Sequence, residues 1–306
     1  MAKSIDKLLV EHRAKGLKRD ENSKMHFKLL PRNQGKDVYN LSAPFTLDGA
    51  LYLLARVEAR DSELSEIGIF TQAQADSLYY WQELDLFRLK LQDPFFTFVN
   101  DEIVIGGVEV DFSKEKLNYR TVFYRGKSLD KLERFAVGPW GMKDIRLKEI
   151  PEGILLLTRP QGKIGGRGTI GWTIIKSLDE LTIANINSAT LLDEMFVEGE
   201  WGGANEIHIT SETEASILGH IAKFDEQRNR HYYASVFNLN FNTGAYTPMK
   251  IIAERQDFAK GEYKRKDLID VIFSGGLLEI DNDYAYLFCG LSDAEAHFRK
   301  INNPLR

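Results

Sequence analysis

The stretch Leu47-Asp48-Gly49-Ala50-Leu51-Tyr52-Leu53-Leu54-Ala55 couples a tight turn to an apolar run of strand length. An Asp-Gly pair beside an apolar run is a strong hairpin signal. Four further turns stand in the same setting, and they start at Asn100, Glu152, Glu212 and Asn282. The five starting positions, 48, 100, 152, 212 and 282, are separated by steps of 52, 52, 60 and 70 residues. Such spacing predicts repeated β units.

A four-stranded propeller blade needs about 40–50 residues, so five units of this size account for the chain from residue 37 to residue 306. We therefore predict an all-β, five-bladed β-propeller that forms one domain over residues 37–306. Residues 1–36 are predicted to be a lead-in. Within it, apolar residues at helical spacing after Ser4 predict a short helix over residues 4–18 that includes Leu17.

Composition narrows the class of protein. The 306 residues are 43% hydrophobic and 28% charged, as expected of a globular chain with a large core. The formal charge of −5 favours neither nucleic acid nor an anionic membrane as a partner, and it favours no particular oligomeric state. The single cysteine, Cys289, lies in an apolar run and is predicted to be buried in a protein of the reducing cytoplasm.

Polar residues recur seven or eight positions before each turn, at Asn40, Asp93, Asp144, Asn205 and Ser274. In a propeller the first strand of each blade lines the central channel, so these strand starts should project toward one mouth. Second strands return to that mouth, and their ends carry Arg56, Arg159 and His220. Each residue alone would be an ordinary solvated strand end. Their repetition predicts one axial pocket.

Carboxylates mixed with arginine and histidine suit a sugar with an anionic co-substrate, because carboxylates bind hydroxyls or donate a proton and arginine binds phosphate. Asp93 is the favoured acid because Pro94 and the apolar run 95–99 follow it and limit its hydration. The glycine-rich stretch 162–168 lacks the ending of a P-loop and is predicted to be a basic rim loop. His208, His220 and His231 lack the spacing of metal ligands. We expect no metal and no cofactor.

These residues resemble, in order, the mannoside phosphorylases of glycoside hydrolase family 130. Residues 40–45 and 53–58 resemble the first blade of that family, and Gln92-Asp93-Pro94 resembles its Glu-Asp-Pro-Arg motif, whose aspartate is the catalytic acid. Residues 143–144 and 157–160 resemble the third blade, where basic residues contact phosphate. Two motif positions differ, since Gln92 replaces the glutamate and Phe95 the arginine.

The last two blades carry further resemblance. Residues 219–222 with Tyr232 resemble the segment that completes the phosphate site, and residues 271–276 with 287–293 resemble the last blade with its sugar-binding aspartate. Residues 205–208 depart from the family's proline-rich fourth-blade segment. The sequences of residues 39–45 and 55–63 are most similar to those of a sister group, the domain family 1861, now grouped as glycosyltransferase family 108.

The resemblance implies an inverting β-mannoside phosphorylase or mannosyltransferase, with β-1,2-linked mannosides expected. Its small-molecule substrates would be β-mannosides with phosphate or mannose 1-phosphate, and GDP-mannose is an additional expected donor. Asp93 would be the catalytic acid. Phosphate would be bound by Lys143, Arg159, His220 and Tyr232, and the sugar by Asn40, Arg56, Asp144, Glu206 and Asp293. Two alternatives stay open: an inverting hydrolase that uses Glu206 or Glu58 as base, and a non-catalytic sugar-binding propeller.

Overall fold

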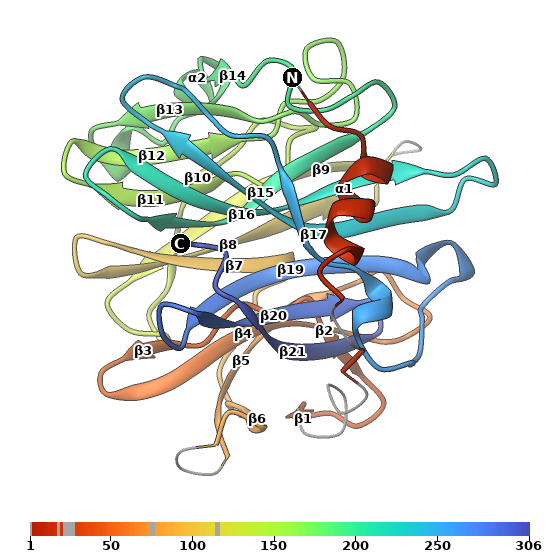
Figure 1. Ribbon diagram of the computed structural model, residues 1–306. Helices are drawn as coiled ribbons and strands as arrows, with labels where there is room; N and C mark the ends of the chain where they lie inside the picture. Colours follow the sequence, from red (N-terminus) through yellow and green to blue (C-terminus); the bar gives the residue numbers. More distant parts are fainter. Residues whose placement is uncertain (1, 17–18, 21–27, 74–76, 114–116) are drawn as a thin grey trace.

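A computed structural model describes residues 2–16, 19–20, 28–73, 77–113 and 117–306. Strands dominate this part of the chain, as predicted, and they form four sheets (Figure 1). The first sheet contains β1 (Lys28–Leu30), β2 (Asp37–Tyr39), β3 (Phe45–Leu47), β4 (Ala50–Glu58), β5 (Glu66–Gln72) and β6 (Tyr80–Glu83). The second contains β7 (Gln92–Val99), β8 (Glu102–Asp111), β9 (Asn118–Gly126) and β10 (Glu133–Val137).

The third and fourth sheets come from the remainder of the chain. The third contains β11 (Arg146–Ile150), β12 (Gly153–Thr158), β13 (Gly171–Ile175) and β14 (Thr190–Leu191). The fourth contains β15 (Trp201–Ile209), β16 (Glu214–Phe224), β17 (Arg230–Asn240), β18 (Lys250–Ala253), β19 (Asp270–Glu279), β20 (Tyr284–Leu291) and β21 (Glu295–Asn302). The helical elements are α1 (Ile5–Arg13), η1 (Leu178–Glu180), α2 (Ile183–Asn187), η2 (Arg255–Asp257) and η3 (Lys266–Leu268).

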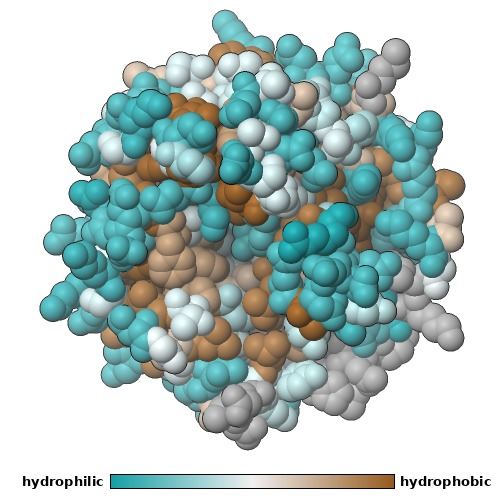
Figure 2. All heavy atoms as spheres, turned by 60° about the vertical axis from the view of Figure 1, so that its left-hand side comes forward, coloured by the Kyte–Doolittle hydropathy of each residue, from teal (hydrophilic) through white to brown (hydrophobic). Residues whose placement is uncertain are grey.

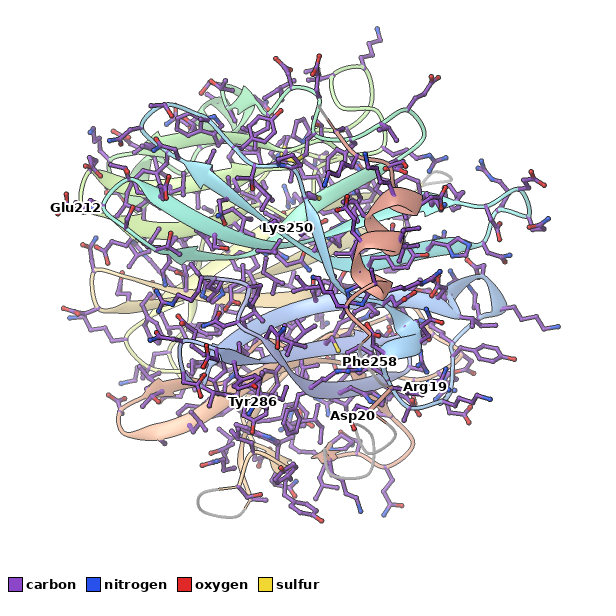
Figure 3. The ribbon with its side chains drawn as sticks, viewed as in Figure 1. Arg19, Asp20, Glu212, Lys250, Phe258 and Tyr286 are labelled. Atoms are coloured by element: carbon purple, nitrogen blue, oxygen red, sulfur yellow. The ribbon has the colours of Figure 1, made fainter. Side chains whose placement is uncertain are left out.

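All five predicted turns join antiparallel strands, at β3–β4, β7–β8, β11–β12, β15–β16 and β19–β20. The first is a mirror-image turn, because Asp48 and Gly49 both have positive φ angles, 49° and 77°. The turns project to the left in Figure 1, and Glu212 marks one of them in Figure 3. Figure 2 brings this side forward, where apolar patches are interrupted by polar side chains.

Four sheets appear in place of five separate units, because the last two hairpin units share one sheet. The outer strand β17 is long enough to pair in parallel with β19 at His231↔Asp270 and Tyr232↔Val271. On either side of this short contact the pairing is antiparallel. The fourth sheet is therefore two units, β15–β18 and β19–β21, joined along one edge.

Apolar side chains fill the space between successive units. One cluster joins the first and second sheets through Leu54 and Ile103, and another joins the third and fourth through Leu155 and Ile217. The last unit also packs on the first, because Leu53 and Phe288 belong to one cluster. A further cluster joins the second and third sheets through Val104 and Leu156, so neighbouring units pack together and the last unit also contacts the first.

Glycines permit the close approach of the first and last units. A Cβ on Gly275 would lie 1.5 Å from the carbonyl oxygen of Leu41, and one on Gly290 would lie 2.0 Å from Oδ1 of Asn40. Any larger residue would force the units apart. This contact is called the first–last seam below.

Helix α1 is shorter than predicted. Ser4 caps its start, as expected, but the helix ends at Arg13, and Gly16 follows with a φ of 66°. A glycine in this left-handed conformation ends a helix because it does not continue the helical backbone. Leu17 lies outside the described residues.

The apolar face of α1 packs beside β16 and β18 (Figure 1). Two polar contacts from the end of the helix hold it in this position. Nε2 of His12 lies 2.8 Å from a carboxylate oxygen of Asp257, and Arg13 donates two hydrogen bonds to Glu254. Beyond the helix, Asp20 forms an isolated parallel β-bridge with Phe258, and the two residues lie close together in Figure 3. The lead-in is thus bound to the sheets.

Two further features concern the environment of the chain. Cys289 is fully buried, as predicted, and forms no disulfide. Within the ranges that the structure describes, no helix has the length and apolarity needed to cross a lipid bilayer.

Candidate active site

Three of the predicted strand starts share one unusual backbone conformation. Asn40, Asp93 and Asp144 have φ angles of 45°, 50° and 58°, in the left-handed region that asparagine and aspartate tolerate better than other side-chain-bearing residues. Asn205 and Ser274 do not share this positive φ, although the strand register shifts at Asp93, at Asn205 and just after Ser274 alike. Such local strain is common where side chains are held for function.

These strand starts open into an axial pocket of about 350 Å³. The predicted site residues that line it are Asn40, Arg56, Asp93, Lys143, Asp144, His220, Tyr232 and Asp293. A second opening of about 460 Å³ adjoins it, shares Lys143 and Tyr232 with it, and is lined by Arg159. The structure therefore brings together nine of the ten residues predicted for the site.

Asp93 is held by two donors at the axial pocket. Its Oδ1 accepts a hydrogen bond of 2.8 Å from the amide of Asn40 and lies 3.3 Å from the guanidinium of Arg56. Its Oδ2 has no hydrogen-bond partner among the described residues and is therefore available to a ligand. Asp93 itself is buried, which limits competing water.

Arg56 joins this carboxylate to a second, fully engaged one. Its guanidinium also donates to Glu58 (3.0 Å), and Glu58 accepts from Tyr39, Ser65 and Lys264 as well. Burial alone would raise the pKa of Glu58, but Arg56 and the hydrogen bonds outweigh it and lower that pKa. Glu58 is consequently an ionised anchor for Arg56.

Asp144 also lines the pocket and stands among cations. Its carboxylate accepts a 3.1 Å hydrogen bond from Arg159, and Arg146 lies 3.9 Å away. Burial would raise the pKa of Asp144, but Lys143, Arg159 and Arg146 together hold it well below its usual value. In turn, Asp144 and Asp93 overcome the effect of burial and raise the pKa of Lys143, so its amine stays charged.

Arg159 is fixed in place by the backbone. It donates to the carbonyl oxygens of Gly202 (2.7 Å) and Arg167 (3.1 Å) in addition to Asp144. Arg167 belongs to the glycine-rich stretch 162–168, which was predicted to be only a rim loop. The stretch also supports the arginine, because Gly168 packs so closely that a Cβ there would lie 2.5 Å from Nε of Arg159.

His220 and Tyr232 form an aromatic pair beside these cations. Their rings stack with centroids 5.5 Å apart. Nδ1 of His220 lies 2.8 Å from Oδ1 of Asn205, and the hydroxyl of Tyr232 accepts a hydrogen bond from Trp201. Burial, only partly opposed by Asp144, lowers the pKa of His220 to about 3, so the ring is neutral.

Asp293 closes the pocket near the first–last seam. It has a φ of 51°, and its carboxylate makes no hydrogen bond to the described residues. Burial raises its pKa despite Arg56, and the neighbouring charge of Asp93 raises it further. Asp293 is thus an unengaged carboxyl group that a sugar hydroxyl can reach.

Glu206 is the predicted site residue that the structure places elsewhere. Its carboxylate accepts from the backbone N–H of Leu277 (2.8 Å) and lies 2.7 Å from Nε2 of His208. It lines neither opening. The side chains of Asn205 and Glu206 both contact β19, because the register of β15 and β16 shifts between Ala204 and Glu206. Asn205 meets β19 at Ser274, whereas Glu206 meets it three residues farther along, at Leu277, away from the pocket.

The family model "Protein of unknown function (DUF1861)" matches residues 12–306, almost the whole chain. The chain belongs to the DUF1861 family. This confirms the resemblance to domain family 1861. No curated protein sequence matches this DUF1861 protein.

Solved structures share its fold. MPT-4, a mannose phosphorylase from Leishmania mexicana in complex with a phosphate ion, is 30% identical with a TM-score of 0.85, over 98% of this chain and 93% of that chain. MPT-1, a GDP-Man-dependent mannosyltransferase from the same organism, is 28% identical with a TM-score of 0.81, over 97% and 94% of the two chains. An endo-arabinase from Bacteroides thetaiotaomicron is similar in fold alone, at 10% identity and a TM-score of 0.54, over 88% and 95%.

Sequence reasoning missed one cation at the centre of this DUF1861 protein. Arg146 is buried, donates to the carbonyl oxygens of Asn205 and Ile145, and places its guanidinium 4.3 Å from the ring centre of Phe95. Phe95 is the residue that replaces the arginine of the Glu-Asp-Pro-Arg motif. A guanidinium group is therefore present beside this position, supplied by the next unit. The replacement of the motif arginine by Phe95 was the sequence signal that another arginine, such as Arg146, could take its place.

Proposed function

We propose that this protein is an inverting β-mannoside phosphorylase and mannosyltransferase. The observation that carries the proposal is the position of a ligand-accessible carboxylate, Asp93, beside a separate anion-binding wall of Lys143, Arg159, His220 and Tyr232. The likeness to a mannose phosphorylase and a mannosyltransferase over nearly the whole chain supports it.

In this mechanism phosphate binds between Lys143 and Arg159 and attacks the anomeric carbon of a bound mannoside. The bond from that carbon to the leaving oxygen breaks, a bond to a phosphate oxygen forms, and Asp93 supplies a proton to the leaving oxygen, directly or through a sugar hydroxyl. Because a single displacement inverts the anomeric centre, a β-mannoside gives α-mannose 1-phosphate. Asn40, Arg56, Asp144 and Asp293 orient the mannosyl ring.

The reverse reaction transfers mannose from mannose 1-phosphate to an acceptor. GDP-mannose is the alternative donor, and the basic opening of about 460 Å³ supports this because it exceeds what a single phosphate ion requires. We infer that the hairpin units are the blades of a five-bladed propeller over residues 37–306. We further propose β-1,2-linked mannosides as substrates.

A hydrolase would need a second carboxylate to activate water, and the two candidates do not support one. Glu58 is saturated by donors, and Glu206 lies outside both openings. Glu63 lines the mouth, but it is paired with Arg265 and Lys264. Asp293 lines the pocket unpaired, but burial and the charge of Asp93 raise its pKa, which disfavours the ionised form that a general base requires. The arrangement therefore favours an anionic nucleophile that needs no general base.

The proposal is tested by measuring mannose 1-phosphate formed from β-1,2-mannobiose, with and without phosphate. We expect phosphate-dependent product from the wild type and a loss of roughly 100-fold or more in kcat for Asp93→Asn. Asp101→Asn is the matched control, since this exposed aspartate of the β7–β8 turn has a similar φ of 59°. Free mannose released equally without phosphate would refute phosphorolysis, and sugar binding without turnover would support a binding protein.

A further inference from the structure

The hydrogen bonds around His220 determine which of its ring nitrogens carries a proton. The carbonyl oxygen of Ser274 can only accept, so the group of Asn205 that lies 2.8 Å from it is the amide nitrogen. The amide oxygen of Asn205 therefore faces Nδ1 of His220, at 2.8 Å. An oxygen acceptor at this distance requires Nδ1 to carry the proton.

A neutral ring with its proton on Nδ1 has a lone pair on Nε2. The charged groups that face His220 are Asp144 and the cations Lys143, Arg159 and Arg146, so the surroundings do not favour a second proton. Nε2 makes no hydrogen bond to the residues that the structure describes. His220 is 5% exposed and lines the axial pocket, so this buried acceptor is directed at whatever binds there.

The other members of the wall are donors. The indole N–H of Trp201 can only donate, so the hydroxyl oxygen of Tyr232 accepts it at 3.2 Å and the hydroxyl proton of Tyr232 must point elsewhere. Lys143 donates from its amine, and Arg159 retains N–H groups beyond its three bonds.

These groups border the two adjoining openings. Lys143 and Tyr232 line both openings, and Gly203 separates Arg159 from His220. A Cβ on Gly203 would lie 2.7 Å from Cδ of Arg159 and 3.0 Å from Cε1 of His220. The wall thus offers several donors and one acceptor where the two openings meet.

We propose that His220 is a fixed acceptor that selects an oxyanion carrying a proton, so that the co-substrate binds as hydrogen phosphate with its P–O–H group donating to Nε2. This inference rests on the proposed use of phosphate. At neutral pH phosphate retains at least one proton, whereas sulfate, of nearly the same shape, has none. Sulfate would place an oxygen lone pair against that of Nε2, and a buried acceptor left without a donor is unfavourable.

The test compares three oxyanions on the purified full chain. Phosphate and arsenate both keep a proton at neutral pH, whereas sulfate does not. With a β-mannoside as second substrate, we expect arsenate to replace phosphate with a similar KM. Sulfate should inhibit with a Ki roughly 10–100-fold above the KM for phosphate.

Two variants probe the acceptor. In His220→Gln the side-chain amide can turn its N–H toward the anion, so phosphate and sulfate should bind within about threefold of each other. In Asn205→Asp a carboxylate faces Nδ1 and favours the imidazolium, which makes Nε2 a donor and should strengthen inhibition by sulfate. His208→Gln, outside both openings, is the matched control and should keep the wild-type preference. Circular dichroism and thermal unfolding verify that each variant folds.

The inference is overturned if sulfate inhibits the wild type with a Ki near the phosphate KM, or if folded His220→Gln keeps the full preference. Calorimetric titration of each anion without sugar tests the role of His220 independently of the proposed phosphorolysis. Phosphate binding with rejection of sulfate, but no phosphate-dependent turnover, would refute phosphorolysis alone. Binding of neither anion would refute both.

Discussion

Replacing Arg159 by lysine should affect both folding and phosphate binding, although the charge is retained. The guanidinium makes three hydrogen bonds, to Gly202 at 2.7 Å and to Arg167 and Asp144 at 3.1 Å. A lysine amine on a flexible stem cannot reproduce this fork and would satisfy one of the three. Two buried carbonyl or carboxylate acceptors would then lose a charged donor.

A hydrogen bond to a charged group contributes about 1.5–3 kcal/mol, so Arg159→Lys should lower the free energy of unfolding by about 3 kcal/mol. The displaced cation should also raise the KM for phosphate roughly 10-fold. Urea unfolding followed by fluorescence measures the first effect, and initial rates at varied phosphate measure the second. Arg60→Lys is the control: Arg60 is exposed, pairs with Asp37, and should change unfolding by less than about 0.5 kcal/mol. An unfolding free energy for Arg159→Lys as close to wild type as that of the control, with an unchanged KM, would refute this reasoning.

Two further predictions concern packing and pH. Gly203→Ala should raise the KM for phosphate, because the added Cβ would lie 2.7 Å from Cδ of Arg159 and displace that side chain. Steady-state kinetics measure this KM. A KM equal to that of the wild type would show that Arg159 can move without loss of phosphate binding. Burial would raise the pKa of Asp257, but the hydrogen bonds from His12 and from the backbone of Glu254, together with the nearby charge of Arg299, outweigh it and lower that pKa in the folded state. Its contribution to stability is therefore present above the unfolded pKa of about 3.9 and is lost as the pH falls below it. Asp257→Asn should lose less stability than wild type in thermal unfolding between neutral and acidic pH, and equal losses would contradict the assignment.

Much of the fold and site could be predicted because their signals repeat. Each hairpin turn carries its own local chemistry, as Asp48-Gly49 does, and counting back from the turns finds Asn40, Asp93 and Asp144 at the pocket. Repetition also compensates for the weakness of each single signal. What repeats along the sequence can be detected without knowledge of the tertiary contacts.

Features that depend on unique contacts between distant segments could not be found this way. Lys264 reaches Glu58 across more than 200 residues, and Arg146 is recognisable only once Phe95 and Asn205 are placed around it. The merging of the last two units depends likewise on the length of β17. Glu206 belongs to the same group, because its position outside the pocket depends on its contacts with Leu277 and His208.

The first–last seam also constrains when an active molecule can arise. Asn40 contributes to the pocket from one side of the seam, and Asp293 contributes from the other, about 250 residues later. During synthesis on the ribosome, the early units can pack on one another, but the pocket stays open until the final strands emerge and Gly275 and Gly290 settle against residues 40 and 41. Contacts of such long sequence separation form slowly. Catalytic competence should therefore appear only with the last step of folding, which leaves nascent or truncated chains inert toward cellular sugars.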